Sequence, residues 1–331
     1  MEPQKEQPQH YLQYPPYNQQ PADDEIDLRE LFGALWKGKW LIIATTFIFV
    51  VGAVLYALSL PNIYKSDALL APAESSGGGG LSKMACQLGG LAALAGVNLG
   101  GNESSQTDLA VQVMKSRQFV EVFINKHDLL VPLMAAKDWD LANNKLILDE
   151  ELYNSNTGEW LREPDGLRGT TPTAQEAFEV FSKEVLSVSQ DKESGLYTLS
   201  VKNYSPYIAQ QWVNWLIEDI NKVMRERTIA ETSQNLAYLN TQLQKTAVAD
   251  MQSTFYKLIE EQTKSLMLAE VQEEFIFKVV DPAVVPELKD GPKRALICVL
   301  GTLLGGMLGV AFVLVRFAFR QEDIEILDSR F

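Results

Sequence analysis

Two uncharged apolar runs dominate the hydropathy pattern, at residues 41–60 and 295–315, near the two ends of an otherwise polar chain. Each run holds about 20 residues, and at about 1.5 Å of rise per residue a helix of that length crosses the roughly 30 Å hydrocarbon core of a bilayer. The pattern predicts transmembrane helix 1 over 41–60 and transmembrane helix 2 over 295–315, and it excludes a purely soluble protein.

The segment before the first run has a helical period. Asp27 stands at an N-cap position, Glu30 follows three residues later, and an apolar face comes next. We expect an amphipathic helix over 24–40 that lies against the inner leaflet and leads into the first span. Residues 1–23, rich in Gln, Pro and Tyr, cannot build a core, so we expect them to form a disordered cytoplasmic tail.

Orientation follows from the residues at the start of the first span. Trp36 and Trp40 bracket Lys37 and Lys39, the aromatic and cationic anchors of a cytoplasmic membrane interface. The run begins forty residues into the chain, which favours a retained anchor over a cleaved signal peptide. We therefore expect both termini in the cytoplasm, residues 61–294 as an extracytoplasmic domain, and 316–331 as a short cytoplasmic tail.

The central region mixes strand and helix patterns. Strands are predicted at 63–71 and 275–280 and a hairpin at 186–190 with 197–201, whereas helices are predicted at 107–130 and 173–187. Nine glycines between 77 and 101 predict a flexible segment. With a helical region between the hairpin and the last strand, this order predicts an α+β membrane protein, in which two transmembrane helices flank a ferredoxin-like α/β base.

The most unusual segment is a helical extension at about 206–272. It lacks Gly and has no Pro after Pro206, and its apolar positions recur at helical spacing. Unbroken, it would be a rod of roughly 100 Å; a turn near Thr246–Asp250, where the apolar stripe loses phase, would make it a hairpin. In either form it exposes more surface than a small domain covers, so we expect it to pack against copies of itself in a homo-oligomer.

Charge and reactive side chains exclude several function classes. A net charge of −14 argues against nucleic-acid binding. Cys86 and Cys298 lie in different regions, so neither a disulfide framework nor a Cys-based zinc site is expected. His10 lies in the tail and His127 follows a helix, where we expect an ordinary polar surface residue. No catalytic site, cofactor or metal is expected, and the carboxylate clusters are interpreted as solvated faces.

One segment partly matches a phosphate-binding loop. Gly33, Gly38 and Lys39 fit the spacing G-x-x-x-x-G-K, but Trp40 stands where a Mg²⁺-binding Ser or Thr belongs. The segment also precedes a membrane span instead of joining a strand to a helix. We therefore do not expect nucleotide binding.

The second span and the segment before it carry a sharper pattern. Gly301, Gly305 and Gly309 form two successive G-x-x-x-G steps, which predicts close approach of another transmembrane helix. Before the span, three prolines restrict φ and predict a stiff connector between domain and membrane. These are Pro282, Pro286 and Pro292.

This connector and span resemble a motif of the Wzz-type polysaccharide co-polymerases, the chain-length determinants of lipopolysaccharide O-antigen. The motif stands here as Pro286-Glu-Leu-Lys-Asp-Gly-Pro292-Lys293, followed after eleven residues by Gly305-Gly306-Met307-Leu308-Gly309. The sequence departs from it at Gly291, where the family usually has Ser, and at Pro282, which is four residues before Pro286 instead of three. The segment 24–40 is similar to the other end of the same family.

The resemblance implies a Gram-negative inner-membrane protein that forms ring-like homo-oligomers, with a periplasmic α/β base and a long helical trunk. It implies a non-catalytic regulator that sets the chain length made by a separate membrane polysaccharide polymerase, with the growing O-antigen glycan as a further candidate partner. No kinase domain is expected after the second span. The alternatives are a two-span periplasmic sensor, for which residues 321–331 leave little room for an output domain, and a periplasmic glycan enzyme.

Overall fold

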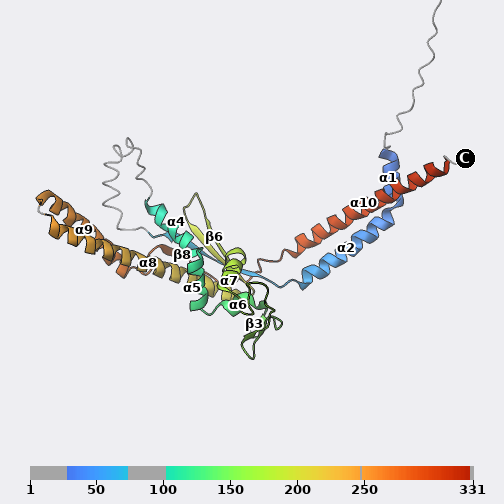
Figure 1. Cartoon of the computed structure of the whole chain (residues 1–331). Coiled ribbons are helices and arrows are strands. Elements are labelled where there is room, and N and C mark those ends of the chain that lie inside the picture. Colours follow the sequence, from blue (N-terminus) through green and yellow to red (C-terminus); the bar gives the residue numbers. More distant parts are fainter. Residues whose placement is uncertain (1–27, 74–101, 247, 329–331) are drawn as a thin grey trace, which may run out of the picture. The chain divides into compact units, whose positions relative to one another are not determined.

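The computed structural model describes residues 28–73, 102–246 and 248–328 (Figure 1). The chain divides into two compact units, which we call the helical unit, Met1–Ala57 with Ala295–Phe331, and the central unit, Leu58–Arg294. The predicted tail 1–23, the predicted flexible segment 77–101 and Cys86 lie outside the described residues.

The helical unit is built from α1 (Leu28–Lys37), α2 (Lys39–Ser59) and α10 (Arg294–Asp328). Two stretches, Lys39–Ser59 and Arg294–Phe317, are long and apolar enough to cross a bilayer. The predicted amphipathic helix ends at Lys37 because the chain turns at Gly38. The predicted tail after 315 is helical over most of its length, since α10 runs on to Asp328.

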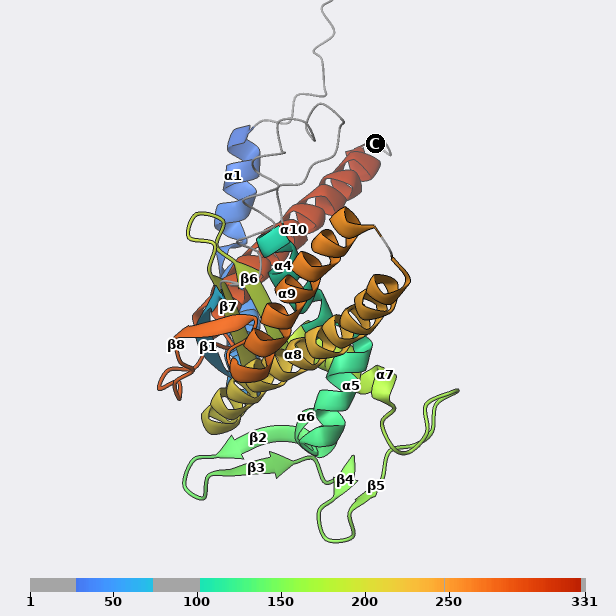
Figure 2. The ribbon, with the colours of Figure 1, turned by 90° about the vertical axis from the view of Figure 1, so that its left-hand side faces the viewer.

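A four-stranded sheet forms the base of the central unit (Figure 2). Its strands are β1 (Tyr64–Pro72), β6 (Leu186–Gln190), β7 (Tyr197–Asn203) and β8 (Phe277–Asp281). They lie in the order β6-β7-β1-β8, and each neighbouring pair is antiparallel. All four strands lie where the sequence places them, to within a few residues.

The β6–β7 hairpin closes through its backbone. The amide of Asp191 donates to the carbonyl of Leu196 at 2.9 Å, and that of Gly195 donates to the carbonyl of Asp191 at 2.8 Å. Gly195 has φ of +72°, a conformation that residues with a Cβ rarely adopt. The Asp-Lys-Glu-Ser-Gly turn therefore fixes the register that pairs Gln190 with Tyr197.

Shorter helices connect β1 to β6. They are α4 (Asn102–Met114), α5 (Arg117–Lys126), α6 (Leu130–Met134), α7 (Ala174–Val180) and the π-helical turn η1 (Phe181–Val185). The single helix predicted at 107–130 is wrong, because the chain breaks at Ser116, whose hydroxyl accepts the amide of Phe119 at 3.3 Å and caps α5.

Helix α8 (Pro206–Lys245) begins in the core and ends outside it. Its first half contributes Trp212 and Leu216 to a cluster that also holds Phe123, Phe181 and Phe277, all at most 1 % exposed. After Met224, Thr232 is the one further residue of α8 that is buried. The first half is therefore held by tertiary packing, and the second half extends away from the sheet.

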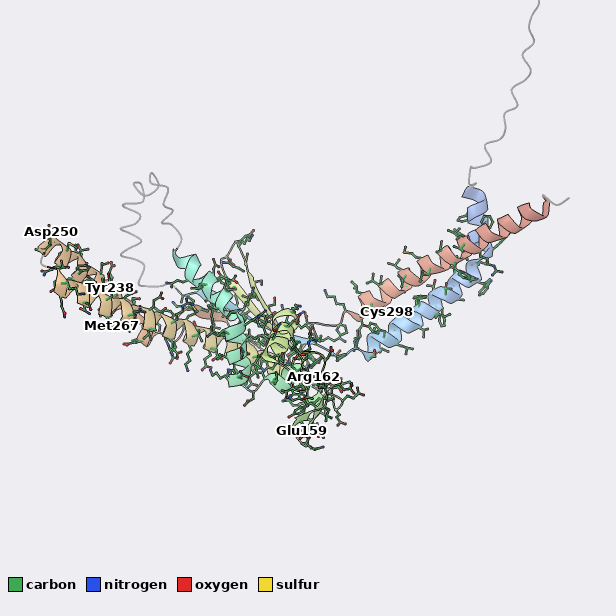
Figure 3. All side chains as sticks on the ribbon, in the orientation of Figure 1. Glu159, Arg162, Tyr238, Asp250, Met267 and Cys298 are labelled. Carbon is green, nitrogen blue, oxygen red and sulfur yellow. The ribbon has the colours of Figure 1, made fainter. Side chains whose placement is uncertain are left out.

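The long helical segment is a hairpin. Helix α8 ends at Lys245, and α9 (Ala249–Val271) packs back along it, as Figures 1 and 2 both show. The 40 residues of α8 correspond to about 60 Å. We call the α8–α9 hairpin the arm. In Figure 3, Tyr238 and Met267 lie along the arm and Asp250 lies near its tip. Tyr238 and Met267 are 62 % and 61 % exposed.

One buried side chain joins the arm to the sheet. Asn221 of α8 accepts the amides of Ile276 and Phe277 at 2.8 and 2.9 Å through its Oδ1. Its Nδ2 donates to the carbonyl of Phe277 at 3.0 Å. Asn221 thereby satisfies three backbone groups where the chain leaves α9 and begins β8.

Two small hairpins lie between α6 and α7, in a region where the sequence pattern predicts no strand or helix. They are β2 (Ala136–Asp140) with β3 (Lys145–Leu148), and β4 (Tyr153–Asn154) with β5 (Glu159–Trp160). Their turns contain Asn144 and Gly158, both with positive φ.

The loop before α7 is anchored by an ion pair. Arg162, labelled in Figure 3, donates to both carboxylate oxygens of Glu176 at 2.9 and 2.8 Å. Glu176 also completes a capping box with Thr173. The hydrogen bond from Arg162 is the main cause that lowers the pKa of Glu176 to about 2.

Because the pKa of Glu176 is lowered, we expect the stability of the chain to depend on pH. The pKa of Glu176 in the folded chain lies below its ordinary value of 4.5. Its ionised carboxylate therefore stabilises the fold fully above pH 4.5, and this stabilisation is lost as the pH falls toward 2. The melting temperature of the detergent-solubilised chain should fall over this range, and by less in Glu176→Gln. Glu163→Gln, an exposed neighbour, is the control and should follow the wild-type curve. Parallel curves for Glu176→Gln and wild type would contradict the assignment.

Candidate membrane-packing site

Three glycines of α10 lie against α2 within the helical unit. A Cβ placed on Gly301 would stand 2.5 Å from the Cβ of Ala53, and one on Gly305 would stand 2.6 Å from the Cβ of Phe49. At Gly309, a Cβ would overlap the hydroxyl of Thr45 and lie 3.1 Å from a backbone atom of α2, the Cα of Ile42. Real Cβ contacts are longer, so the two helices could not keep this spacing with larger residues.

Gly306 is different. The nearest atom to a Cβ at this position is the Thr46 hydroxyl oxygen, at 3.9 Å, an ordinary van der Waals distance. Gly305 and Gly309 are buried, whereas Gly306 is only half-buried. The structure therefore brings Gly301, Gly305 and Gly309 together on one packing face and leaves Gly306 off it.

Two threonine hydroxyls of α2 are satisfied within that helix. Thr45 donates to the carbonyls of Leu41 and Ile42 at 3.0 and 2.9 Å, and Thr46 donates to that of Ile42 at 2.7 Å. Such bonds to the preceding turn allow hydroxyl groups to lie in an apolar environment. The contact between the two helices thus presents small and apolar groups.

The connector after β8 is held to the base by side chains. Pro282 follows the last residue of β8 directly and is exposed, whereas Pro286 is half-buried. Between them, the carbonyl of Val284 accepts the Ser66 hydroxyl at 2.8 Å, and that of Ala283 accepts the Gln210 amide at 2.9 Å. The connector is therefore fixed to β1 and to α8.

The end of the connector pairs with the segment that follows α2. Ile63 forms an isolated antiparallel bridge with Gly291, with an amide-to-carbonyl distance of 3.0 Å. Arg294 donates to the carbonyl of Leu60 and to the side chain of Asn62, both at 3.2 Å. Half-buried Pro292 and exposed Lys293 lie between these contacts. We call the paired segments 60–63 and 289–294 the clamp.

An ion pair joins the clamp to the sheet. The carboxylate of Asp290 lies 2.8 Å from the ammonium of Lys202 on β7. The hydrogen bond from Lys202 is the main cause that lowers the pKa of Asp290. The backbone of Asp290 also donates to the carbonyl of Ile63 at 2.8 Å. The main-chain bond holds the two clamp segments together, and the ion pair ties the clamp to β7.

His127 is not the surface residue that the sequence predicts. Its imidazole stacks on Trp215 at 4.2 Å between ring centroids, and its Nε2 lies 2.9 Å from the carboxylate of Asp219. Only 13 % of the side chain is exposed. Lys126 also binds Asp219, which is 6 % exposed. Because α8 supplies both Trp215 and Asp219, this cluster joins α5 to α8.

The partial phosphate-loop match has helical geometry. Gly33 lies inside α1, and Lys39 is the first residue of α2. A phosphate loop wraps the anion with backbone amides between a strand and a helix. Here the segment lies in two helices joined at Gly38, whose carbonyl accepts the amide of Leu41 at 2.9 Å.

Comparison with known families gives two matches. The Wzz family, chain length determinant protein, matches residues 24–127, which include α1, α2 and β1. GNVR, a G-rich domain described on tyrosine kinases, matches residues 239–318, which include the connector and the glycine face. The resemblance of this chain to the chain-length determinants, the Wzz-type polysaccharide co-polymerases, is confirmed.

Among individual proteins, the ferric enterobactin transport protein FepE of Escherichia coli K12 is 25 % identical over 370 residues, covering 96 % of each chain. The tyrosine-protein kinase wzc of Salmonella typhimurium LT2 is 28 % identical over 108 residues, covering 33 % of this chain but 13 % of the kinase. The second likeness is thus restricted to a small part of the kinase.

Several solved structures are similar to this chain, and two of them are polysaccharide co-polymerases. A full-length bacterial polysaccharide co-polymerase gives a TM-score of 0.36 at 15 % identity, covering 89 % of this chain and 99 % of that one. A fragment of WzzB, the polysaccharide co-polymerase from Salmonella Typhimurium, gives 0.31 at 12 % identity, covering 70 % and 100 %. TM-scores of this size do not define a shared fold.

Proposed function

We propose that this chain is a non-catalytic regulator of lipopolysaccharide O-antigen chain length, acting as an oligomeric inner-membrane scaffold on a separate polysaccharide polymerase. The observation that carries this proposal is the match of residues 24–127 to the chain length determinant family. The chain would make no glycosidic bond and would require no cofactor. It would change how long the growing glycan stays engaged with the polymerase.

The proposed topology has two spans, both termini in the cytoplasm and residues 61–294 in the periplasm. It is supported by the anchors at the start of α2. The ammonium of Lys39 lies 4.9 Å from the centroid of the Trp36 ring, and Trp36 and Trp40 are 64 % and 75 % exposed. Exposed tryptophans beside lysines are typical of a membrane interface, with the lysines on the cytoplasmic side.

The proposed domain architecture is a ferredoxin-like base with a helical trunk. The strand order β6-β7-β1-β8, with antiparallel neighbours, supports the β-α-β-β-α-β arrangement. The trunk would be the α8–α9 hairpin, and copies would assemble along it. Exposed apolar side chains on the arm, such as Tyr238 and Met267, support that role because they have no cover within one chain.

The proline and glycine residues are proposed to hold geometry at the membrane. The face of Gly301, Gly305 and Gly309 would keep the two spans at close packing. The connector, with Pro282, Pro286, Pro292 and Lys293, would restrict the backbone between β8 and the second span. Gly306 lies off the packing face, with Thr46 at an ordinary van der Waals distance.

The test is the O-antigen ladder of a strain from which this chain is deleted. We expect O-antigen still to be polymerised but without its modal length, and a plasmid copy should restore the mode. An unchanged ladder would exclude the proposal. Loss of all polymerisation would instead indicate an enzyme. Uptake of ferric enterobactin, measured in parallel, should be unaffected if the regulatory role is correct.

A further inference from the structure

Three aromatic rings meet beside the start of β1. The ring of Tyr64 meets that of Trp139 edge to face, with centroids 5.7 Å apart and an interplanar angle of 81°. Trp139 also lies 6.1 Å from the ring of Tyr207, at the start of α8. The indole N–H of Trp139 donates to the side chain of Asn144 at 3.1 Å, which fixes the ring to the β2–β3 turn. We call residues 139–144 the hairpin tip.

The hairpin tip lies near the points where the chain joins the two apolar helices. Tyr64 is the fifth residue after Ser59, the end of α2, and five residues span at most about 18 Å. Arg294, the first residue of α10, is hydrogen-bonded to Leu60 in the same segment. Trp139 is remote in sequence from both helices. Its contact with Tyr64 thus brings it close to the end of α2 and the start of α10.

The surface of this cluster combines apolar and cationic groups. Leu141, in the turn, is 76 % exposed, and Tyr207 is 49 % exposed. Lys289 and Lys293 are exposed at the nearby clamp. Aromatic rings with a satisfied polar atom, an exposed aliphatic side chain and adjacent lysines are the combination found at membrane–water interfaces.

A carboxylate limits how deep the hairpin tip could insert. Asp140 accepts hydrogen bonds from the side chain of Asn143 at 2.6 Å and the amide of Ala142 at 2.9 Å. These bonds lower its pKa, so it stays ionised at neutral pH. An ionised group belongs among headgroups, where ammonium groups can neutralise it, and not in hydrocarbon.

We propose that the hairpin tip, with Tyr207 beside it, docks on the lipid headgroup layer of the leaflet from which both spans emerge. This would be a third, peripheral membrane contact beside the two spans. It rests on the two-span topology proposed above, but not on which polysaccharide is regulated. A bilayer is the occupant that fits this surface, because the exposed leucine and the aromatic rings lie a few residues from the ends of both apolar helices.

The test uses the full chain with Cys86 and Cys298 replaced by Ala, reconstituted alone in vesicles of phosphatidylethanolamine and phosphatidylglycerol. A nitroxide is attached through Leu141→Cys, and collision rates with oxygen, which enters lipid, and with a water-soluble nickel chelate are measured by electron paramagnetic resonance. Met251→Cys at the far end of the arm is the aqueous control. Ala142→Cys is a second reporter in the same turn, should the Leu141 variant fail to fold.

At position 141 we expect the ratio of oxygen to nickel collisions to rise several-fold on transfer from amphipol to vesicles, with no rise at position 251. Strong nickel collisions in vesicles would place the hairpin tip in water and overturn the proposal. Shielding from both reagents, already present in amphipol, would place it against a second copy and would also overturn it.

A label at Leu303→Cys, on α10, separates this inference from the topology. Leu303 is 59 % exposed and lies within the candidate span, so it should report lipid if α10 crosses the bilayer. Lipid contact at 303 with water at 141 would overturn the docking contact alone. Water at both positions would overturn the two-span topology as well.

Discussion

Replacing Gly305 and Gly309 together by Leu is expected to abolish the modal O-antigen length while leaving polymerisation intact. A Cβ at Gly305 would lie 2.6 Å from the Cβ of Phe49 and 3.1 Å from a backbone atom of α2, the Cα of Thr46. A backbone atom cannot rotate away, so the larger side chains must push α2 and α10 apart. The measurement is the lipopolysaccharide ladder of a deletion strain complemented with the variant at matched membrane levels.

Gly306→Leu is the matched control for the packing face. It adds the same side chain one residue away, but its Cβ would approach no atom closer than 3.9 Å. We expect this variant to keep α2 and α10 at their normal spacing, and any effect on the ladder to be the smaller one. A normal ladder from the Gly305/Gly309 double variant, at normal expression, would refute the role given to this face.

Asn221→Ala is expected to destabilise the central unit by about 3 kcal/mol. The substitution removes the partner of three backbone groups of Ile276 and Phe277. Each buried polar group left without a partner costs about 1–3 kcal/mol, and water entering the site offsets part of the total. Urea unfolding of the detergent-solubilised chain, followed by tryptophan fluorescence, measures this directly because Trp212 and Trp215 lie on the same helix.

Asn214→Ala supplies the control for this substitution. Asn214 lies on α8 two turns before Asn221 and is exposed, so we expect a change within about 0.5 kcal/mol of zero. If the two variants had equal stability, Asn221 would not be the residue that fixes β8 against α8.

The sheet and the two apolar helices could be predicted because their patterns are local. Alternation of apolar residues and the Asp191-to-Gly195 turn located β6 and β7, and uncharged runs located α2 and α10. The break between α8 and α9 could not be assigned, because Thr246–Val248 contains neither Gly nor Pro. Only the loss of phase in the apolar stripe indicated it, and tertiary packing of α9 along α8 decides the hairpin.

Other features of the structure could not be predicted because the local sequence does not determine them. The strands β2 to β5 are short, and their turns use Asn144 and Gly158, residues that are also frequent in plain loops. His127 looked like a surface residue because its partners, Trp215 and Asp219, are about 90 residues away in sequence. At the candidate site, the spacing of the glycines predicted the packing face, but only the geometry distinguished Gly306 from its neighbour Gly305.

Reconstitution of glycan synthesis from purified components would show whether this chain sets product length without making bonds itself. Polysaccharide polymerase and lipid-linked O-antigen units are combined in vesicles with and without this chain, and the product lengths are resolved on a gel. We expect a broad distribution from the polymerase alone, a narrow mode when the chain is added, and no product from the chain without polymerase. Turnover of lipid-linked glycan by the chain alone, or an identical distribution with and without it, would show that the chain is not a non-catalytic length regulator.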